Sequence, residues 1–468
     1  MSSESVGFVQ SAEKLQEAFK QVQKYFQNDF IKRWTGEVEQ YKEFAANPTF
    51  QVAVVGAVNA GKSTFLNAIL GDEFASTEVT PETASLTIFK YAPSNYVKIK
   101  FLSRAEWDDL WASATKKPDS IFSKEFKALN GEQFISEWVG HTEIEEKVSS
   151  ADAIKNMAKR YSSSKSVEHY FVKELEIGIS QFPDSLPREI VFVDTPGLDD
   201  VVPYRSDITK QYITRANAVI VCVNAKVMQG EQFRTITGVF EQVGKPQKVM
   251  VLGTQADTFT KPSRDWEKNR LEWGKYLGEL FKDEVLMGKN LIGVSSVIFA
   301  TAEKLKNGKQ IEDNQITTIA RFAAGNNIEI PQFGAREDIL QAIKNNIPAI
   351  LKSSGIPFFF ESLQTGPLKD SDIELKNDLA FKFTNIENEV KNQALDIQKS
   401  VEEQLKVLNG TVEEKEKSIA DKKADYEALN KYTAEVEDSF NEMRNKVNAA
   451  IANVKVKLDT ELKTAIGG

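Results

Sequence analysis

The stretch from Val52 to Thr64 constrains this chain more than any other part of its sequence. Its apolar start predicts a buried β-strand, and the apolar spacing over residues 65–70 predicts the helix that follows. Between them lies Gly56-x-x-x-x-Gly61-Lys62-Ser63, a loop whose backbone N–H groups can surround a phosphate. The N-terminus of the helix adds partial positive charge there. A strand, this loop and a helix in that order predict a polyphosphate site rather than a glycine-rich turn that binds nothing.

Individual residues of this loop have distinct expected roles. Lys62 can reach the β- and γ-phosphates of a nucleotide, and the Ser63 hydroxyl can bind Mg²⁺. The loop residues that we expect to contact the nucleotide are Gly56, Asn59, Ala60, Gly61, Lys62, Ser63 and Thr64.

Length, charge and cysteine content narrow the class of protein. With 468 residues the chain is too long for one core, so we expect two or three domains. The formal net charge of −9 argues against a nucleic-acid binder. The single cysteine, Cys222, lies in an apolar run, which predicts a core thiol and suits a reducing cytoplasm. Because no apolar run approaches the roughly 20 residues of a membrane span, we expect any membrane contact to be peripheral.

The hydrophobic pattern divides the chain into three parts. Residues 1–47 show helical spacing, residues 48–330 alternate strand and helix patterns, and residues 331–468 are expected to form a C-terminal helical part, whose composition becomes charged and poor in glycine from about Asp370 onward. This order predicts an α/β domain with a mostly parallel sheet and helices on both faces, plus an elongated bundle of N- and C-terminal helices. Residues 104–165 have the pattern of a largely helical insertion. The expected strands cover residues 50–56, 86–91, 97–102, 189–193, 218–223, 248–253 and 291–294.

Two long apolar stripes at helical spacing run through the C-terminal part, one over residues 386–412 and one over residues 429–462. Asn409-Gly410 can end a first helix, and Thr411 with Glu414 can cap a second. A helical hairpin and one long kinked helix are both compatible with this pattern.

Three further motifs follow strands of the α/β part. The segment from Asp194 to Gly197 offers a carboxylate that can hold Mg²⁺ through water and an N–H that can sense a terminal phosphate. In Thr254-Gln255-Ala-Asp257, the Asp257 carboxylate can accept the N1–H and N2–H of guanine, which adenine does not offer. The pair Ser295-Ser296 can supply a backbone N–H to the guanine oxygen. In this order the motifs predict a GTP site.

This ordered set over residues 50–300 resembles the dynamin superfamily of large GTPases, most closely its bacterial dynamin-like members. Thr83 stands where that family has a Mg²⁺-binding, water-orienting threonine, with Thr80 as the second candidate, and Thr254 also matches the family. The resemblance implies GTP hydrolysis with Mg²⁺, dimerisation or larger homo-oligomers formed across the nucleotide face, and a helical stalk that acts in membrane remodelling.

Two residues depart from related GTPases. The family usually has lysine where this chain has Gln255, which predicts weaker nucleotide binding and less certain base selectivity. Leu198 stands where small GTPases have a water-positioning glutamine, so catalysis must come from elsewhere. The resemblance implies Thr83, the P-loop (residues 56–63) and a monovalent cation. We hypothesise that Asn59 holds K⁺ or Na⁺; the alternative is an asparagine that only hydrogen-bonds the loop.

The target of the stalk is not evident from the sequence. The apolar run Gly355–Phe360 favours a buried core over a membrane wedge, because Pro357 can begin a helix that packs through Phe358, Phe359 and Leu363. The stalk is either short or part of a longer polypeptide. The competing function is a nucleotide-gated interaction protein with slow hydrolysis that switches binding to a protein partner. A GTPase that serves RNA is disfavoured by the acidic charge.

Overall fold

The computed structural model divides the chain into two compact units, residues 50–369 and residues 1–49 with 370–468. We describe each unit by itself. The structure describes Gln10 and residues 13–14, 16–17, 20, 29–46, 49–57, 59–75, 85–115, 121–163, 165–198, 203–227, 230–243, 246–281, 290–369, 371–408 and 415–466.

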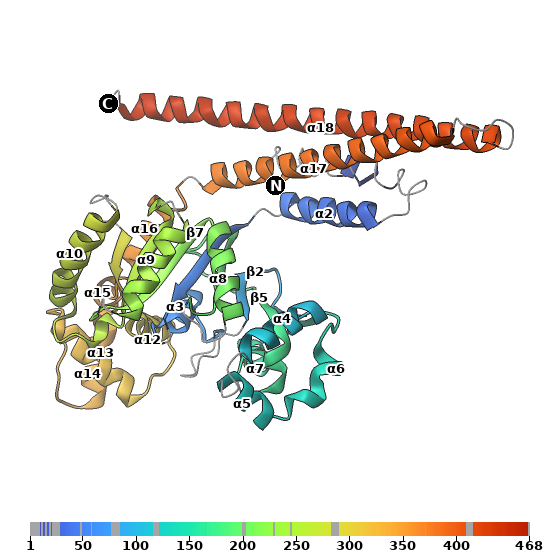
Figure 1. The fold of residues 1–468 in the computed structure, drawn as a ribbon. Helices are drawn as coiled ribbons and strands as arrows, with labels where there is room; N and C mark the ends of the chain where they lie inside the picture. Colours follow the sequence, from blue (N-terminus) through green and yellow to red (C-terminus); the bar gives the residue numbers. More distant parts are fainter. Residues whose placement is uncertain are drawn as a thin grey trace. The chain divides into compact units, whose positions relative to one another are not determined.

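A nine-stranded sheet forms the centre of the first unit, in the order β4-β3-β5-β2-β6-β1-β7-β8-β9 (Figure 1). The run from β6 to β9 is parallel, and β2 also pairs parallel with β5. Three pairs are antiparallel: β2 with β6, β3 with β5 and β3 with β4. The strands are β1 (Phe50–Gly56), β2 (Leu86–Tyr91), β3 (Tyr96–Phe101), β4 (Ile144–Lys147), β5 (Val172–Ile179), β6 (Ile190–Asp194), β7 (Ala218–Asn224), β8 (Val249–Thr254) and β9 (Leu291–Gly293).

Helices cover both faces of this sheet, as the sequence predicted. Alternate residues of β1 enter different cores: Val52 and Val54 join one apolar cluster, and Ala53 and Val55 join another. The first cluster includes α3 (Lys62–Leu70), and the second includes residues of α8 (Pro203–Arg215), α9 (Glu231–Val243) and α10 (Pro262–Phe281). Strands buried on both faces need continuous apolar runs, which is why β1, β6, β7 and β8 were recognisable.

The insertion differs from its prediction in one respect. Residues 104–165 contain α4 (Arg104–Ala114), α5 (Ile121–Ala128), α6 (Ile135–Trp138) and α7 (Ala151–Ser162), but also the edge strand β4. The insertion was expected to be largely helical, and β4 was missed because its Ile-Glu-Glu-Lys sequence is mostly exposed. Strand β5, which pairs with β3 and β2, was also not among the expected strands. Aromatic packing fixes the inserted helices: the Trp107 ring lies 4.9 Å from Phe171 and 5.7 Å from Trp111.

The helical region after β9 belongs to the sheet unit, so the unit ends at Lys369 and not at the expected residue 330. The reason is apolar packing: α12 to α15 share one buried cluster, and α16 packs into the main core through Phe359 and Leu363. Phe358, expected on the packing face, is 53% exposed instead. The helices are α12 (Ser296–Lys306), α13 (Asp313–Gly325), α14 (Arg336–Asn345), α15 (Ile347–Ser353) and α16 (Ile356–Thr365).

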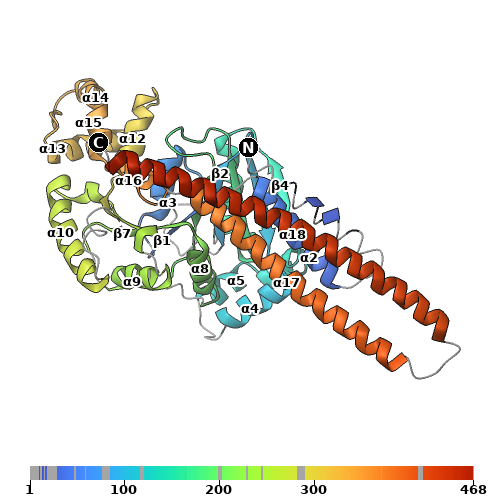
Figure 2. The same ribbon diagram turned by 90° about the horizontal axis from the view of Figure 1, so that it is seen from above.

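The second unit contains α2 (Asp29–Ala46), α17 (Ser371–Leu408) and α18 (Lys415–Ile466), with α17 and α18 side by side in both views (Figures 1 and 2). Phe383 contacts Phe440 at 5.0 Å, and Gln398 donates to the Tyr426 hydroxyl. Along α17 from residue 383 to residue 398, the contacting residue on α18 changes from 440 to 426, so the two helices are antiparallel. The hairpin prediction therefore holds and the single kinked helix does not; Asn409-Gly410 lies outside the described residues.

The N-terminal helix completes the core of this unit. Val38 and Tyr41 of α2 are buried together with Phe383 and Phe440. The two predicted C-terminal stripes supply Ile386, Val390, Val436, Phe440 and Met443, whereas Phe383 and the residues of α2 lie outside those stripes. No helix among the described residues combines the length and apolar character needed to cross a bilayer.

Candidate nucleotide site

The P-loop turns sharply between β1 and α3. Gly61 adopts a left-handed conformation with φ +81° directly before α3, and Asn59 is also left-handed with φ +61°. A Cβ at Gly56 would lie 2.5 Å from the Cys222 carbonyl oxygen of the adjacent β7. Only glycine fits at position 56, and glycine is the residue that adopts the Gly61 conformation without strain. The loop is thus built by the packing of β1 against β7.

Lys62 and Ser63 begin α3 and face the loop and β6. The Lys62 ammonium donates to the Gly56 carbonyl oxygen at 3.1 Å, so the side chain folds over the loop. The Ser63 hydroxyl donates to a carboxylate oxygen of Asp194 at 3.5 Å. These two contacts bring the loop and the end of β6, predicted as separate motifs, to one point.

Asp194 is buried at the end of β6, with 3% of its surface exposed. Burial raises its pKa to about 6, while Lys62 and Ser63 lower it. Its second oxygen, Oδ1, has no hydrogen-bond partner among the described residues. A buried carboxylate oxygen without a donor is costly unless a cation or water satisfies it. The residues therefore fit a Mg²⁺ ion bound by Ser63 and, through water, by Asp194.

The segment after Asp194 is tied to the sheet. The Thr195 hydroxyl donates to the Val54 carbonyl oxygen at 3.1 Å, and the Thr209 hydroxyl of α8 donates to the Pro196 carbonyl at 3.0 Å. A Cβ at Gly197 would come within 3.9 Å of Gly56 O, so the segment passes close to the P-loop. Leu198 packs against the apolar cluster of β7 and β8. It contributes to the core at the position where small GTPases carry glutamine.

The end of β8 holds the apex of the P-loop. The Thr254 hydroxyl lies 2.6 Å from the Ala60 carbonyl oxygen and 2.9 Å from that of Val223, with one hydrogen to donate between them. The next residue, Gln255, donates from Nε2 to the Asn59 carbonyl at 3.0 Å. Thr254 and Gln255, both expected at the base site, therefore also contact the phosphate loop.

Asp257 lies in η4 (Ala256–Thr258), the short helical turn after β8. It is partly buried, and burial raises the pKa of its carboxyl group. Arg321 and Lys226 oppose this shift. Neither cation was predicted as part of the site, because no motif marks a charge that acts at a distance. Together they favour the ionised carboxylate that guanine recognition requires.

The loop after β9 (the base loop), which we expect to lie at the guanine base, is held by the turn between α15 and α16. The Ser295 N–H donates to the Ser354 carbonyl oxygen at 2.8 Å, which leaves Ser296 as the candidate N–H donor to a guanine oxygen. The Ser296 hydroxyl is buried and has no partner within the described part of the chain. Ser296 and Thr64 line the same hollow between α3 and α12, of about 790 Å³.

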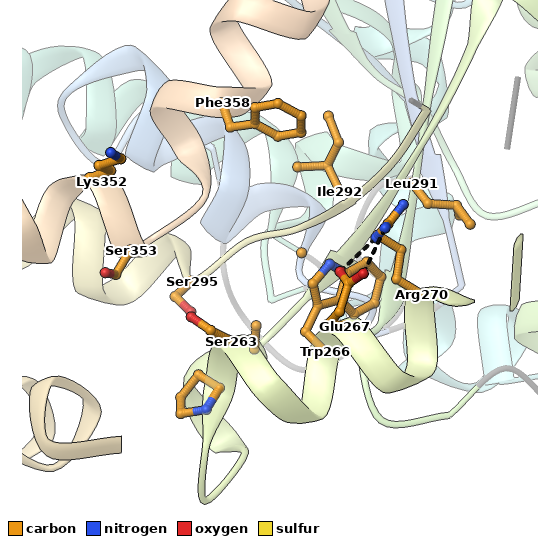
Figure 3. Close-up of a pocket in the computed structure, with 13 residues that line it drawn as sticks. Ser263, Trp266, Glu267, Arg270, Leu291, Ile292, Ser295, Lys352, Ser353 and Phe358 are labelled. Carbon is orange, nitrogen blue, oxygen red and sulfur yellow. Dashed lines mark hydrogen bonds and ion pairs between the residues drawn. The ribbon is translucent and has the colours of Figure 1, made fainter. Parts of the chain in front are cut away.

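A smaller hollow of about 460 Å³ lies beside this loop, between α10, β9 and α16 (Figure 3). Ser295 lines it together with Trp266 and Phe358, and Glu267 pairs with Arg270 at its side. Trp266 packs on two glycines of the sheet: a Cβ at Gly253 would lie 2.3 Å from its ring.

Asn224, at the end of β7, is a site residue that the sequence reading missed. Its Nδ2 donates to Gln255 Oε1 at 2.9 Å. No signature in the sequence marks an asparagine that acts only through a neighbour. In contrast, Thr83 and Thr80, expected to bind Mg²⁺ and orient water, lie outside the described residues.

Fold and site together define the class: a P-loop nucleotide-binding domain with its site at the carboxyl ends of parallel strands. Residues 52–251 match the model of the dynamin family. This segment is therefore similar to the dynamin family, and its relatives include bacterial dynamin-like proteins.

Several characterised proteins share this domain. Dynamin-like protein 1 of Campylobacter jejuni is 33% identical over 219 residues, which cover 43% of this chain and 28% of that protein. The bacterial dynamin-like protein of Nostoc punctiforme is 26% identical over 176 residues, with 38% and 20% covered. Clamp-binding protein CrfC of Escherichia coli is 24% identical over 242 residues, with 47% and 33% covered. The similarity thus spans a third or less of these relatives' own length.

One solved structure aligns along the whole chain. It is that of an oligomerised bacterial dynamin pair described as sensing and tethering membranes, with 21% identity, a TM-score of 0.47 and 70% of that chain covered.

Proposed function

We propose that this protein binds GTP and hydrolyses it with Mg²⁺. The observation that carries the proposal is the Ser63–Asp194 pair at the start of the P-loop helix, with a buried carboxylate oxygen that has no hydrogen-bond partner among the described residues. A Mg²⁺ ion there would be held by Ser63, by Asp194 through water and by Thr83, and it would neutralise charge on the β- and γ-phosphates. Lys62 would move from the Gly56 carbonyl to these phosphates.

Guanine selection follows from the elements around Asp257. Its carboxylate would accept the two guanine N–H groups, the Ser296 N–H would meet the guanine oxygen, and the Gln255 stem would cover the base. The carboxylate must be ionised to accept both hydrogens; burial raises the pKa of Asp257, and Arg321 and Lys226 act against that shift.

A monovalent cation at Asn59 would complete catalysis. Asn59 is left-handed and its side chain is exposed at the loop apex, where it can reach the phosphates. K⁺ or Na⁺ there would supply the charge that an arginine finger supplies in other GTPases. GTP turnover compared in K⁺, Na⁺ and choline buffers tests this, and equal rates in the three buffers would exclude it.

Hydrolysis would be coupled to movement of the helical unit, with homodimers forming across the nucleotide face. Phe381 is 67% exposed and Leu395 53% exposed on α17, and these two side chains are the candidate contacts of this helix with a second copy or with a membrane surface. The same side chains fit a protein partner, so a nucleotide-gated interaction protein is the second candidate.

Turnover separates these candidates. Specific GTPase activity that rises with protein concentration and with liposomes supports a self-assembling dynamin-type enzyme. Slow turnover that does not change with either supports the nucleotide-gated interaction protein. No GTP turnover beyond the buffer rate, at any concentration, would reject the proposed hydrolysis.

A further inference from the structure

Three backbone and side-chain amides form a continuous chain that ends on the P-loop. The Lys226 N–H donates to Asn224 Oδ1 at 2.9 Å, and Asn224 Nδ2 donates to Gln255 Oε1 at 2.9 Å. Gln255 Nε2 then donates to the Asn59 carbonyl oxygen at 3.0 Å. Each side-chain amide accepts a hydrogen bond from the preceding residue of this chain and donates one to the next. The hydrogen bonds therefore all run in one direction, from the end of β7 to the P-loop.

This direction fixes how the Gln255 amide is oriented. An isolated glutamine can turn its amide by 180° at little cost, which would place an oxygen against the Asn59 carbonyl. Asn224 removes that freedom, because its own oxygen is held by Lys226 N–H and its Nδ2 must face an acceptor. Hydrogen bonds aligned in this way also polarise and strengthen one another.

The chain also joins two strained positions. Asn59 has φ +61° and Gln255 has φ +58°, a left-handed conformation that asparagine tolerates better than glutamine does. Gln255 is held a second time by its own backbone, since its carbonyl accepts the Thr258 hydroxyl at 2.7 Å. Asn59 lies in the loop that must surround the phosphates. Among the described residues, Gln255 is the one side-chain donor to the Asn59 carbonyl, while Thr254 and Lys62 hold the neighbouring carbonyls of Ala60 and Gly56.

We propose that Asn224 is a positioning residue of the nucleotide site, which acts through Gln255 to hold Asn59 in its left-handed conformation. A lysine at position 255 has three donors and needs no orienting partner, whereas a glutamine needs one. Asn224 is therefore the residue that lets glutamine stand at this position. This inference rests on the proposed GTP site, but its test includes a readout that needs no nucleotide.

The decisive variants are Asn224→Asp and Asn224→Asp combined with Gln255→Lys. An aspartate at 224 faces Gln255 Oε1 with an acceptor, which forces the glutamine to turn its nitrogen away from Asn59. A lysine at 255 can donate to that aspartate and to the Asn59 carbonyl at once. We expect Asn224→Asp to weaken GDP binding about tenfold, and the double variant to recover most of the loss.

Hydrogen exchange of the nucleotide-free protein supplies the second readout. The amides of residues 56–63 should exchange faster in Asn224→Asp and return towards the wild-type rate in the double variant. Gln242→Lys is the matched control, because Gln242 is exposed on α9 and donates only to the Thr214 hydroxyl. It should change neither readout. Thermal melting of each variant checks that it folds.

A second pair, Asn224→Ala and Gln255→Met, tests the same inference without new charge. If Asn224 acts only through Gln255, the double variant binds GDP no more weakly than Gln255→Met alone. If the losses of GDP affinity in Asn224→Ala and Gln255→Met multiply in the double variant, the inference is overturned. It is also overturned if Gln255→Lys restores neither GDP binding nor amide protection in Asn224→Asp. Wild-type protein that binds no GTP, with the exchange pattern still as expected, would reject the proposed function and leave the amide chain in place.

Discussion

At the scale of single residues, the candidate site contains a side chain whose charged form is destabilised by burial. That side chain is Asp194, since burial raises its pKa while no described residue satisfies Oδ1. The ordinary aspartate pKa is 3.8 and the buried one about 6, so the folded protein binds this proton more tightly than the unfolded chain does. Stability therefore falls as pH rises through this interval, and the cost persists at neutral pH.

Asp194→Asn should remove that cost. We expect the nucleotide-free variant to gain roughly 1–3 kcal/mol of unfolding free energy at pH 7.5 and less near pH 5, as measured by urea unfolding. Mg²⁺-dependent GTP turnover should fall by at least about a hundredfold, because the amide cannot replace the carboxylate. Asp207→Asn, on the exposed face of α8, is the control and should change stability by less than about 0.5 kcal/mol. A destabilised Asp194→Asn would contradict this interpretation.

Asp257→Asn should exchange the base that is preferred. Xanthine has a carbonyl where guanine has an amino group, and the asparagine amide can donate to that carbonyl. We expect GTP binding to weaken about a hundredfold and XTP binding to strengthen by a similar factor, in competition assays with a fluorescent nucleotide. A variant that binds neither GTP nor XTP would show that Asp257 supports the loop and does not contact the base.

The residues that the sequence motifs named explain only part of the site. Asp194 and Ser63 were predictable because each belongs to a motif with a fixed place at a strand end or helix start. Asn224 was not, since an asparagine at the end of a strand has no signature until its partner is known. The fixed orientation of the Gln255 amide is likewise a property of three loops in contact, and no single segment encodes it.

At the scale of helices and strands, the base loop is held by the turn between α15 and α16. Ser354 accepts the Ser295 N–H, and Gly355 follows with φ +79°. A Cβ at Gly355 would lie 1.9 Å from the Gly293 carbonyl oxygen. On the other side of α16, Phe359 contacts Phe65 of the P-loop helix edge-on at 5.0 Å. One helix thus packs against the segments that we propose to bind base and phosphate.

Gly355→Ala should separate this turn from the base loop. The clash with backbone and the left-handed conformation together should cost about 2–4 kcal/mol, and GDP affinity should fall with it. Gly308→Ala is a matched control with φ +72° and no heavy atom within 4 Å of a Cβ, so it carries the strain alone at about 1 kcal/mol. Equal melting temperatures for the two variants would show that the turn is not a rigid support.

Strand prediction succeeded and failed for the same physical reason. Strands buried on both faces read as continuous apolar runs, whereas β4 has three charged residues out of four and is mostly exposed. The choice between hairpin and single helix was open because both bury the same stripes. Contacts between α17 and α18 show that the hairpin forms. The periodicity of a sequence does not reveal such contacts between residues far apart along the chain.

At the scale of the whole molecule, the chain forms two units with separate apolar cores. The described residues that we propose to contact the nucleotide all lie in the sheet unit. Helix α16 is the last helix of this unit before α17 begins. Phe440 is fully buried in the helical unit against Phe383.

Phe440→Ala should therefore damage one unit and spare the other. We expect a loss of about 3–5 kcal/mol in the unfolding of the helical unit, with GDP affinity within about twofold of wild type. Phe381→Ala removes an exposed ring from the neighbouring helix and should leave both quantities nearly unchanged. Loss of GDP binding in Phe440→Ala would show that the two units are not independent in stability.

The most direct test of the central claim is a calorimetric titration of the wild-type protein with GDP and with ADP, in the presence of Mg²⁺. A site read by Asp257 and cradled by the P-loop predicts GDP binding at least about a hundredfold tighter than ADP, and loss of that preference in Asp257→Asn. Equal affinity for the two nucleotides, or binding of neither, would contradict it.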